Sequence, residues 1–393
     1  MDLVRAWKEL CEASTLPAIE PFASEWVSIG HGYPRKVLGH WDSPQIIREI
    51  AFFDLQRAKD LLRLYLTHSF RKEDGMMALW VLASSDKNYT PSTKGASFLC
   101  SHPPIWSHCA RIILTSEWDE SLALLSLQTG IANLAWWNAN RRDPLGLYWY
   151  QDSYPDEDKC WESGYDASPR WDHTELGPFP CIDLNCQILM LLEDLSFIAE
   201  KLNEKETAKK MNKEYLQLKK KIGRYFWDEL YGCFTDYDLA GANAKKTCGL
   251  FWSLISGAAE ESDIERMEEL LKGEEGFSAK YGITTVALSE KSFTLDCWRG
   301  PMWFSQIYWL CIGLQRYQRK SLAASIAQKS LFTATKILHE TGVIWEFYNP
   351  LEGSVSNLLR KGSPTGPFPN YLGHNPFISL TRIADREDLW RKE

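Results

Sequence analysis

The residues best suited to chemistry lie close together at residues 161–172, which read WESGYDASPRWD and contain three carboxylates, two tryptophans and one arginine. Gly164 and Pro169 disfavour regular structure, so the sequence predicts that Asp166 lies on a short irregular loop. Apolar neighbours raise the pKa of a carboxyl group, which is what a general acid needs near neutral pH. The same residues also fit a solvated acidic loop with tryptophans packed beneath it.

Two segments resemble one enzyme family. The stretch at 161–172 resembles the WESGxDNSPRWD signature of glycoside hydrolase family 63 and the related mannosylglycerate hydrolases, and more distantly the ESGWD segment of trehalases. This resemblance implies that Asp166 is the general acid. A second segment, WEFYNPLEG at residues 345–353, resembles the family's xxEYYNPxxG segment and implies that Glu346 is the general base. The two segments occur in the order that the family uses.

The resemblance also implies a reaction, the hydrolysis with inversion of a small α-glycoside. An α-glucoside, an α-mannoside or a sugar linked to glycerate would fit. One carboxyl group protonates the leaving oxygen, and a second, roughly 6.5 to 9.5 Å away, deprotonates a water. Glu162 is a rival for the role of acid, and it equally suits a hydrogen-bond acceptor that holds the loop.

Further segments supply candidate contacts to the substrate. CWRGPMW at residues 297–303 resembles the family's YWRGPIW segment, whose arginine lines the sugar pocket, although Arg299 would equally suit an ion pair with a core acid. Asp42 resembles the aspartate of the family's WD segment, and an alternative is that Asp42 or Ser43 caps the next helix. Arg170 suits either a substrate contact or a buttress of the acid loop. The candidate binding residues are Trp41, Asp42, His102, Trp161, Glu162, Arg170, Trp298, Arg299, Trp303, Tyr348, Asn349 and His374.

Four departures from the family pattern leave the reaction open. Each changes a group expected near the innermost sugar, and they are Ala167, His102, the FSQI segment at 304–307 with Ser305, and His374. An alternative is therefore a repurposed enzyme that uses the same two carboxylates for an isomerisation, elimination or cyclisation. A binding protein without catalysis is disfavoured, because the acid and the base are both present.

Composition limits the partners and the compartment. The 393 residues carry a net charge of −8 at pH 7, which disfavours nucleic acids and anionic membranes because both would repel the chain. With no apolar run of signal-peptide length at the N-terminus and none near 18 residues elsewhere, we expect a cytoplasmic protein. Ten cysteines without CxxC pairs and dispersed histidines predict reduced thiols, no metal and no cofactor. We expect a small-molecule substrate, and a homo-oligomer stays open.

Helical periodicity supplies the elements that must position these residues. Apolar residues recur at helical spacing in 44–70, 106–115, 117–140, 179–202, 201–226, 248–258, 262–271, 301–317 and 322–341. The helix at 179–202 is expected to start at Asp183, and residues 227–238 read as a β-hairpin around Gly232. This pattern supports an all-α protein with one domain over residues 1–393, and the resemblance implies an (α/α)6 barrel with small hairpin insertions. The segment 352–370, rich in Gly, Ser and Pro, is a candidate lid.

Overall fold

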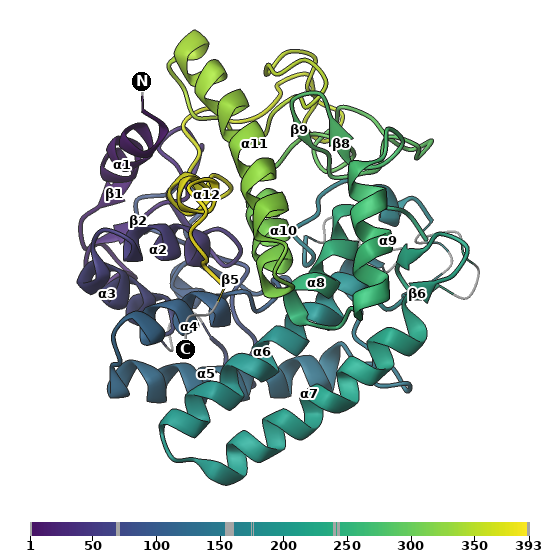
Figure 1. Ribbon diagram of the computed structural model, residues 1–393. Coiled ribbons are helices and arrows are strands. Elements are labelled where there is room, and N and C mark those ends of the chain that lie inside the picture. Colours follow the sequence, from purple (N-terminus) through teal and green to yellow (C-terminus); the bar gives the residue numbers. More distant parts are fainter. Residues whose placement is uncertain are drawn as a thin grey trace.

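Helices dominate the computed structural model of the protein, which describes residues 2–67, 71–153, 161–173, 175, 177–238, 241 and 244–390 (Figure 1). Within these ranges six helices form an inner ring, in which each contacts the next and the last contacts the first. They are α2 (Ser43–Ala51), α4 (Trp106–Ser116), α6 (Ile182–Lys201), α8 (Trp252–Ser256), α10 (Phe304–Arg316) and α12 (Phe377–Ala384). The outer helices alternate with them along the chain and are α1 (Leu3–Ala13), α3 (Leu55–Tyr65), α5 (Glu120–Asn140), α7 (Lys205–Tyr225), α9 (Glu261–Lys272) and α11 (Lys320–Thr341). The predicted all-α class and (α/α)6 barrel are confirmed.

The inner and outer helices differ in how they bury their side chains. Almost every side chain of α10 is buried, and α6 is buried along most of its length. Helix α7, in contrast, buries Ala208, Met211, Leu218 and Ile222 and exposes most of its lysines. A helix that is buried on all sides belongs inside a protein, whereas an amphipathic helix covers a surface. The residue pattern therefore directs α10 to the inner ring and α7 to the outer one.

A buried carboxylate joins the first and last helices of the inner ring. Glu49 of α2 accepts hydrogen bonds from the backbone amides of Ile378 and Ser379, at 2.8 and 2.9 Å, in the first turn of α12. Because the free amides of a helix N-terminus carry partial positive charge, a carboxylate there stabilises the helix. Arg48 lies beside Glu49, and its guanidinium is 3.6 Å from the centroid of the Tyr308 ring on α10. These contacts hold together the three helices that close the barrel.

Short antiparallel strands and 3₁₀ turns occupy the connections between helices. Strand β3 (Val37–Gly39) pairs with β4 (Trp80–Leu82), which pairs with β5 (Ala96–Ser97). Strands β6 (Trp227–Asp228) and β7 (Cys233–Phe234) confirm the predicted hairpin, and Gly232 between them has a φ of +62°. The remaining short elements are β1 (Thr15–Leu16), β2 (Trp26–Val27), β8 (Ser278–Ala279) and β9 (Gly282–Ile283), with 3₁₀ turns at Pro91–Thr93, Gln151–Ser153, Pro169–Trp171 and Cys248–Phe251. Because β3 runs almost directly into Trp41 and Asp42, the three-stranded sheet fixes the position of these two residues.

Some predicted helix bounds were wrong. Residues 44–70 do not form one helix: α2 ends at Ala51 and Asp54 begins α3, where its carboxylate accepts a hydrogen bond from the Arg57 amide at 3.0 Å. Residues 68–70 of that prediction lie outside the described part. Helix α6 begins before Asp183, because this carboxylate pairs with buried Arg170 at 2.9 Å instead of capping the helix. Residues 248–258 form a 3₁₀ turn and the short α8, and α12 had no predicted counterpart.

The described part of the chain also bears on the expectations about membranes and metals. No helix in it is both long enough and apolar enough to cross a bilayer. Among the same residues, no group of three His, Cys, Asp or Glu side chains is arranged to hold a metal ion. The cysteines that the structure describes as free are all buried.

Candidate active site

The predicted acid and base line the same cavity, which has a volume of about 330 Å³. Asp166 and Glu346 reach it from distant segments of the chain. The predicted binding residues that also line it are Trp41, Asp42, His102, Trp161, Trp298, Trp303 and His374. Sequence reasoning missed other parts of the wall, notably Tyr33, Arg35, Trp80, Arg360, Lys361, Phe368 and Tyr371. The cavity is therefore aromatic and carries charges of both signs.

Asp166 lies on a tight loop that packs against an indole. The backbone turns at Gly164, with a φ of +75°, and a β-carbon there would lie 3.2 Å from the Trp41 ring. Only glycine adopts this conformation freely and allows so close an approach. Ala167 follows with a φ of +60°, a region that asparagine tolerates better than alanine. The Asp166 carboxylate faces the cavity, where Lys361 Nζ lies 2.5 Å from its Oδ2 atom.

Glu346 is almost fully buried at the cavity wall. Its carboxylate accepts hydrogen bonds from Arg360 Nε at 3.1 Å, from Arg360 Nη2 at 3.3 Å and from the Phe368 backbone amide at 3.1 Å. Burial raises the pKa of Glu346, while the charge and hydrogen bonds of Arg360 and the amide of Phe368 oppose that rise. A buried carboxylate with a raised pKa is a stronger base than an exposed one, and these donors fix its orientation.

Arg360 and Lys361 occupy one tight turn and hold one carboxylate each. The turn is closed by backbone hydrogen bonds between Arg360 and Ser363, and Lys361 and Gly362 have φ values of +53° and +74°. The Gly362 amide donates to Asp296 Oδ2 at 2.8 Å, which fastens the turn to the segment before Trp298. The turn lies within the predicted lid segment 352–370. In the sequence, this turn could have been recognised as two adjacent basic residues before a glycine in a polar loop.

Asp42 lies in the same cavity and is held by Tyr371, whose hydroxyl donates to Asp42 Oδ1 at 2.7 Å. Burial raises the pKa of Asp42 to about 7, and the charges of Glu346 and Asp166 add to the rise, while the Tyr371 hydrogen bond opposes it. The predicted capping roles are not observed. Asp42 makes no side-chain cap, and Ser43 Oγ has no hydrogen-bond partner among the residues that the structure describes.

Two histidines face the cavity in their neutral form. Burial lowers the pKa of His102 to about 4 and that of His374 to about 3. His102 Nδ1 lies 3.1 Å from the Glu162 carbonyl oxygen, and His374 Nδ1 lies 2.8 Å from Ser305 Oγ. A neutral imidazole offers one donor and one acceptor, so both rings suit hydroxyl groups better than anions. Two of the four family departures, His374 and Ser305, thus form one hydrogen-bonded unit.

Aromatic rings form two further walls of the cavity. Trp298 stacks on Trp303 with ring centroids 3.9 Å apart and an interplanar angle of 10°. On another part of the wall, Trp80 and Trp161 lie 5.7 Å apart. A cation lies over each of these two indoles: Arg35 is 5.7 Å from the Trp80 ring, and Lys361 Nζ is 5.0 Å from the Trp161 ring. Flat apolar faces beside polar groups suit a sugar ring.

Glu162 and Arg170 do not line the cavity and instead support the acid loop. The Glu162 carboxylate is buried, pairs with Arg141 Nε at 2.7 Å, and accepts the backbone amide of Gln151 at 2.8 Å. Arg170 is fully buried and pairs with Asp183 and with Asp236 on the inner side of the loop. The Glu162 carboxylate and the Nε and Nη2 groups of Arg170 are thus engaged within the protein, as in the structural alternatives for these residues.

Arg299, Tyr348 and Asn349 also lie outside the cavity wall. Arg299 forms an ion pair with Asp172 through two contacts of 2.7 and 2.8 Å, but the side chain of Asp172 is 36% exposed, so the partner is not the core acid that the alternative expected. The Tyr348 hydroxyl accepts the Trp345 amide at 3.1 Å. Asn349 Oδ1 accepts the Leu351 amide at 3.0 Å, so both residues shape the turn that follows Glu346.

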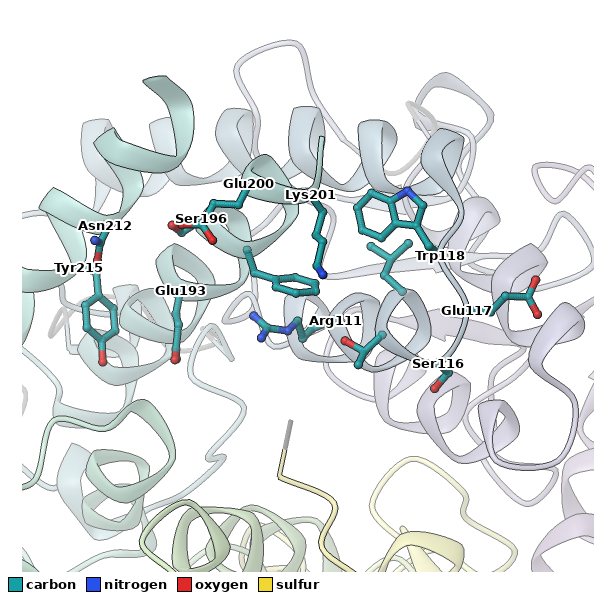
Figure 2. Close-up of a pocket in the computed structure, with 13 residues that line it drawn as sticks. Arg111, Ser116, Glu117, Trp118, Glu193, Ser196, Glu200, Lys201, Asn212 and Tyr215 are labelled. Atoms are coloured by element: carbon teal, nitrogen blue, oxygen red, sulfur yellow. The ribbon is translucent and has the colours of Figure 1, made fainter. Parts of the chain in front are cut away.

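A larger hollow lies elsewhere, between α4, α6 and α7, with a volume of about 850 Å³ (Figure 2). Arg111 stacks on the Phe197 ring in it, 3.5 Å from the centroid, and Glu193 pairs with Arg316 at 3.0 Å. None of the residues predicted to act on a substrate lies in this hollow. We call it the outer hollow.

Comparison with known proteins places the chain among glycoside hydrolases. The model of the mannosylglycerate hydrolase MGH1-like glycoside hydrolase domain matches residues 36–366. The mannosylglycerate hydrolase MGH1 of Selaginella moellendorffii is 24% identical over 87% of this chain and 82% of its own length. A protein of Borreliella burgdorferi is 28% identical, but the match covers 48% of this chain and only 40% of that relative.

Solved structures of similar fold include the GH63 mannosylglycerate hydrolase of Thermus thermophilus in complex with glucose. It superimposes with a TM-score of 0.76 at 17% identity and covers 98% of this chain and 100% of that one. At this identity the likeness concerns the fold, and it agrees with the closed ring of inner helices described above.

Proposed function

Because the chain belongs to the mannosylglycerate hydrolase MGH1-like glycoside hydrolase family, we propose that it hydrolyses a small α-glycoside with inversion, with Asp166 as general acid and Glu346 as general base. One observation carries this proposal: the two carboxylates line a single aromatic cavity although they come from distant segments. They also differ in environment. Glu346 is held rigidly by Arg360, whereas Asp166 is more exposed and meets a flexible lysine.

The two carboxyl groups would divide the reaction as follows. Protonated Asp166 gives its proton to the glycosidic oxygen while the bond from that oxygen to the anomeric carbon breaks. Glu346 takes a proton from a water, whose oxygen forms the new bond on the opposite face of the sugar. Arg360 keeps the base oriented and favours its ionised form.

The innermost sugar would bind between the stacked tryptophans and the Asp42 side. Asp42 and the neutral rings of His102 and His374 offer acceptors and donors for hydroxyl groups. The volume of about 330 Å³ suits a sugar with a small second group rather than a long oligosaccharide. The wall around Trp80 and Trp161, with Arg35 and Lys361, would then face the second group, the aglycone.

An acidic aglycone fits this wall best, because both ring-stacked side chains are cations. The names of two similar proteins agree with it. The relative in Selaginella is a mannosylglycerate hydrolase, and the Thermus enzyme has also been solved in complex with Tris and D-glycerate. We therefore propose an α-mannoside or α-glucoside of a small hydroxy acid as the substrate.

A substrate panel tests this proposal. Purified protein is offered α-mannosides and α-glucosides with neutral and with acidic aglycones, and ¹H NMR follows which anomer of the free sugar appears first. We expect release of the β-anomer from an α-glycoside, and no release by Glu346→Gln that retains a native circular dichroism spectrum. First appearance of the α-anomer would refute inversion. Conversion of a panel member without sugar release would favour the repurposed enzyme instead.

A further inference from the structure

Lys361 contacts one of the two oxygens of the carboxylate through which Asp166 would act. Its Nζ atom lies 2.5 Å from Asp166 Oδ2 and 5.0 Å from the Trp161 ring centroid. A general acid must bring a protonated oxygen within about 2.6 to 3.2 Å of the leaving oxygen. An ammonium group at hydrogen-bond distance occupies a position on Oδ2 that the leaving oxygen would otherwise take. Proton transfer through Oδ2 therefore requires that Lys361 move away from Asp166.

The structure allows that movement for the lysine side chain but not for its neighbour on the turn. Arg360 is held by two hydrogen bonds to Glu346, and the Gly362 amide fastens the backbone to Asp296. Lys361, in contrast, has a side chain that is 34% exposed, and among the described residues it makes one carboxylate contact at the end of a flexible four-carbon stem. The ammonium can thus swing while the turn stays in place.

The backbone of Lys361 adopts a conformation that is uncommon for a lysine. Its φ of +53° lies in the left-handed region, which is unfavourable for a residue with a β-carbon. Glycine or asparagine would occupy the position with less strain. Here the strained backbone aims an ammonium group at the acid.

We propose that Lys361 determines specificity by releasing the acid only for substrates with an anionic aglycone, a step that rests on the proposed function. The carboxylate of the aglycone forms an ion pair with the Lys361 ammonium group, which thereby leaves Asp166. Asp166 then takes up one proton from solvent and passes it to the glycosidic oxygen. A neutral aglycone leaves the Lys361–Asp166 pair intact and is cleaved slowly. Arg35, which lies over the neighbouring indole, provides a second cation on the same wall.

A matched pair of substrates tests the proposal: one sugar carrying a carboxylate aglycone, and the same compound as its methyl ester. We expect the wild-type protein to prefer the acid by about 10- to 100-fold in kcat/KM, the range of one charge-assisted hydrogen bond. Lys361→Met should cut kcat/KM for the acid and raise kcat for the ester, so that the preference disappears. Lys361→Arg should restore much of it. Lys280→Met is the control, because Lys280 also lies over a ring, that of Tyr281, but outside the cavity.

Two results would overturn the proposal. One is an equal loss on both substrates in Lys361→Met, which would mean that Lys361 only holds Asp166 in place. The other is an unchanged preference. If the wild-type protein cleaves neither compound, the proposed function fails. The inference is then tested by titrating D-glycerate, with inorganic phosphate as a second anion, against tryptophan fluorescence. Binding of glycerate that is lost in Lys361→Met supports anion recognition, and binding that does not depend on Lys361 contradicts it.

Discussion

The outer hollow has a volume of about 850 Å³, against about 330 Å³ for the cavity that holds Asp166 and Glu346. The smaller space is nevertheless the better candidate site. The side chain of Glu346 is 4% exposed, and burial raises its pKa. Glu117 in the outer hollow is 65% exposed and pairs with Lys59 at 2.6 Å, as a surface residue does. The volume of a cavity therefore does not mark it as an active site, whereas buried carboxylates with shifted pKa values do.

The arrangement of cations separates the two spaces further. In the inner cavity, Arg360 and Lys361 come from one turn and each meets a carboxylate assigned to catalysis. In the outer hollow, Arg111 stacks on Phe197 within the wall. The comparison thus predicts large effects for substitutions in the first space and small ones in the second.

The largest expected effect is on catalysis itself. Asp166→Asn and Glu346→Gln should each lower kcat by about 10²- to 10⁴-fold on a natural-type glycoside. The two should separate on a substrate with a leaving group that needs no proton, such as a glycosyl fluoride. Asp166→Asn should then recover much of its rate, and Glu346→Gln should not. If Glu346→Gln recovered its rate on this substrate and Asp166→Asn did not, Glu346 would be the general acid and Asp166 the general base.

Substitution of Arg170, which supports the acid loop, should have the next largest effect. This effect is on the free energy of unfolding. Arg170→Met leaves the buried carboxylates of Asp183 and Asp236 without their cation, and loss of one partner of a buried pair costs about 3 to 5 kcal/mol. Arg299→Met removes a more exposed pair with Asp172 and should cost about 1 kcal/mol or less. Urea denaturation of both variants measures the difference. Equal losses would show that burial does not set the importance of these pairs.

The pH dependence of activity should shift when the cation beside the base is removed. Burial raises the pKa of Glu346 and Arg360 lowers it, so Arg360→Gln should raise this pKa further. The base works in its ionised form, and kcat/KM therefore falls as pH drops through its pKa. The acidic limb of the kcat/KM profile should move to higher pH in Arg360→Gln. A limb that stays in place, or moves to lower pH, would assign it to another group.

The smallest expected effect is in the outer hollow. Glu200→Gln makes the same chemical change there as Glu346→Gln makes in the inner cavity. Activity should stay within about twofold, and the free energy of unfolding should stay within about 0.5 kcal/mol, as for most surface substitutions. Steady-state kinetics and thermal denaturation check both values. A marked loss of activity would show that the outer hollow has a functional role, and the predicted difference between it and the inner cavity would be wrong.

Sequence reasoning named many of the residues that line the candidate cavity, but it missed Arg35, Arg360 and Lys361. Asp166 and Glu346 lie in motifs whose residue order is informative, and the predicted family is confirmed by the domain match. The same reasoning could not separate binding residues from supporting ones within a motif. Trp161 lines the cavity and its neighbour Glu162 does not, because Glu162 is directed to Arg141 on another segment. Such a partner is invisible in a local pattern.

The sequence by itself indicated most of the helices, the all-α class and the two candidate carboxylates, because helical periodicity and short motifs are local properties of a chain. Only the tertiary structure decided which charges meet. Lys361 reaches Asp166, and Tyr371 reaches Asp42, across large separations in the sequence. These contacts follow from closure of the barrel, which brings loops of distant helices to one cavity. Their effects on charge depend on burial, and burial is a property of the whole fold.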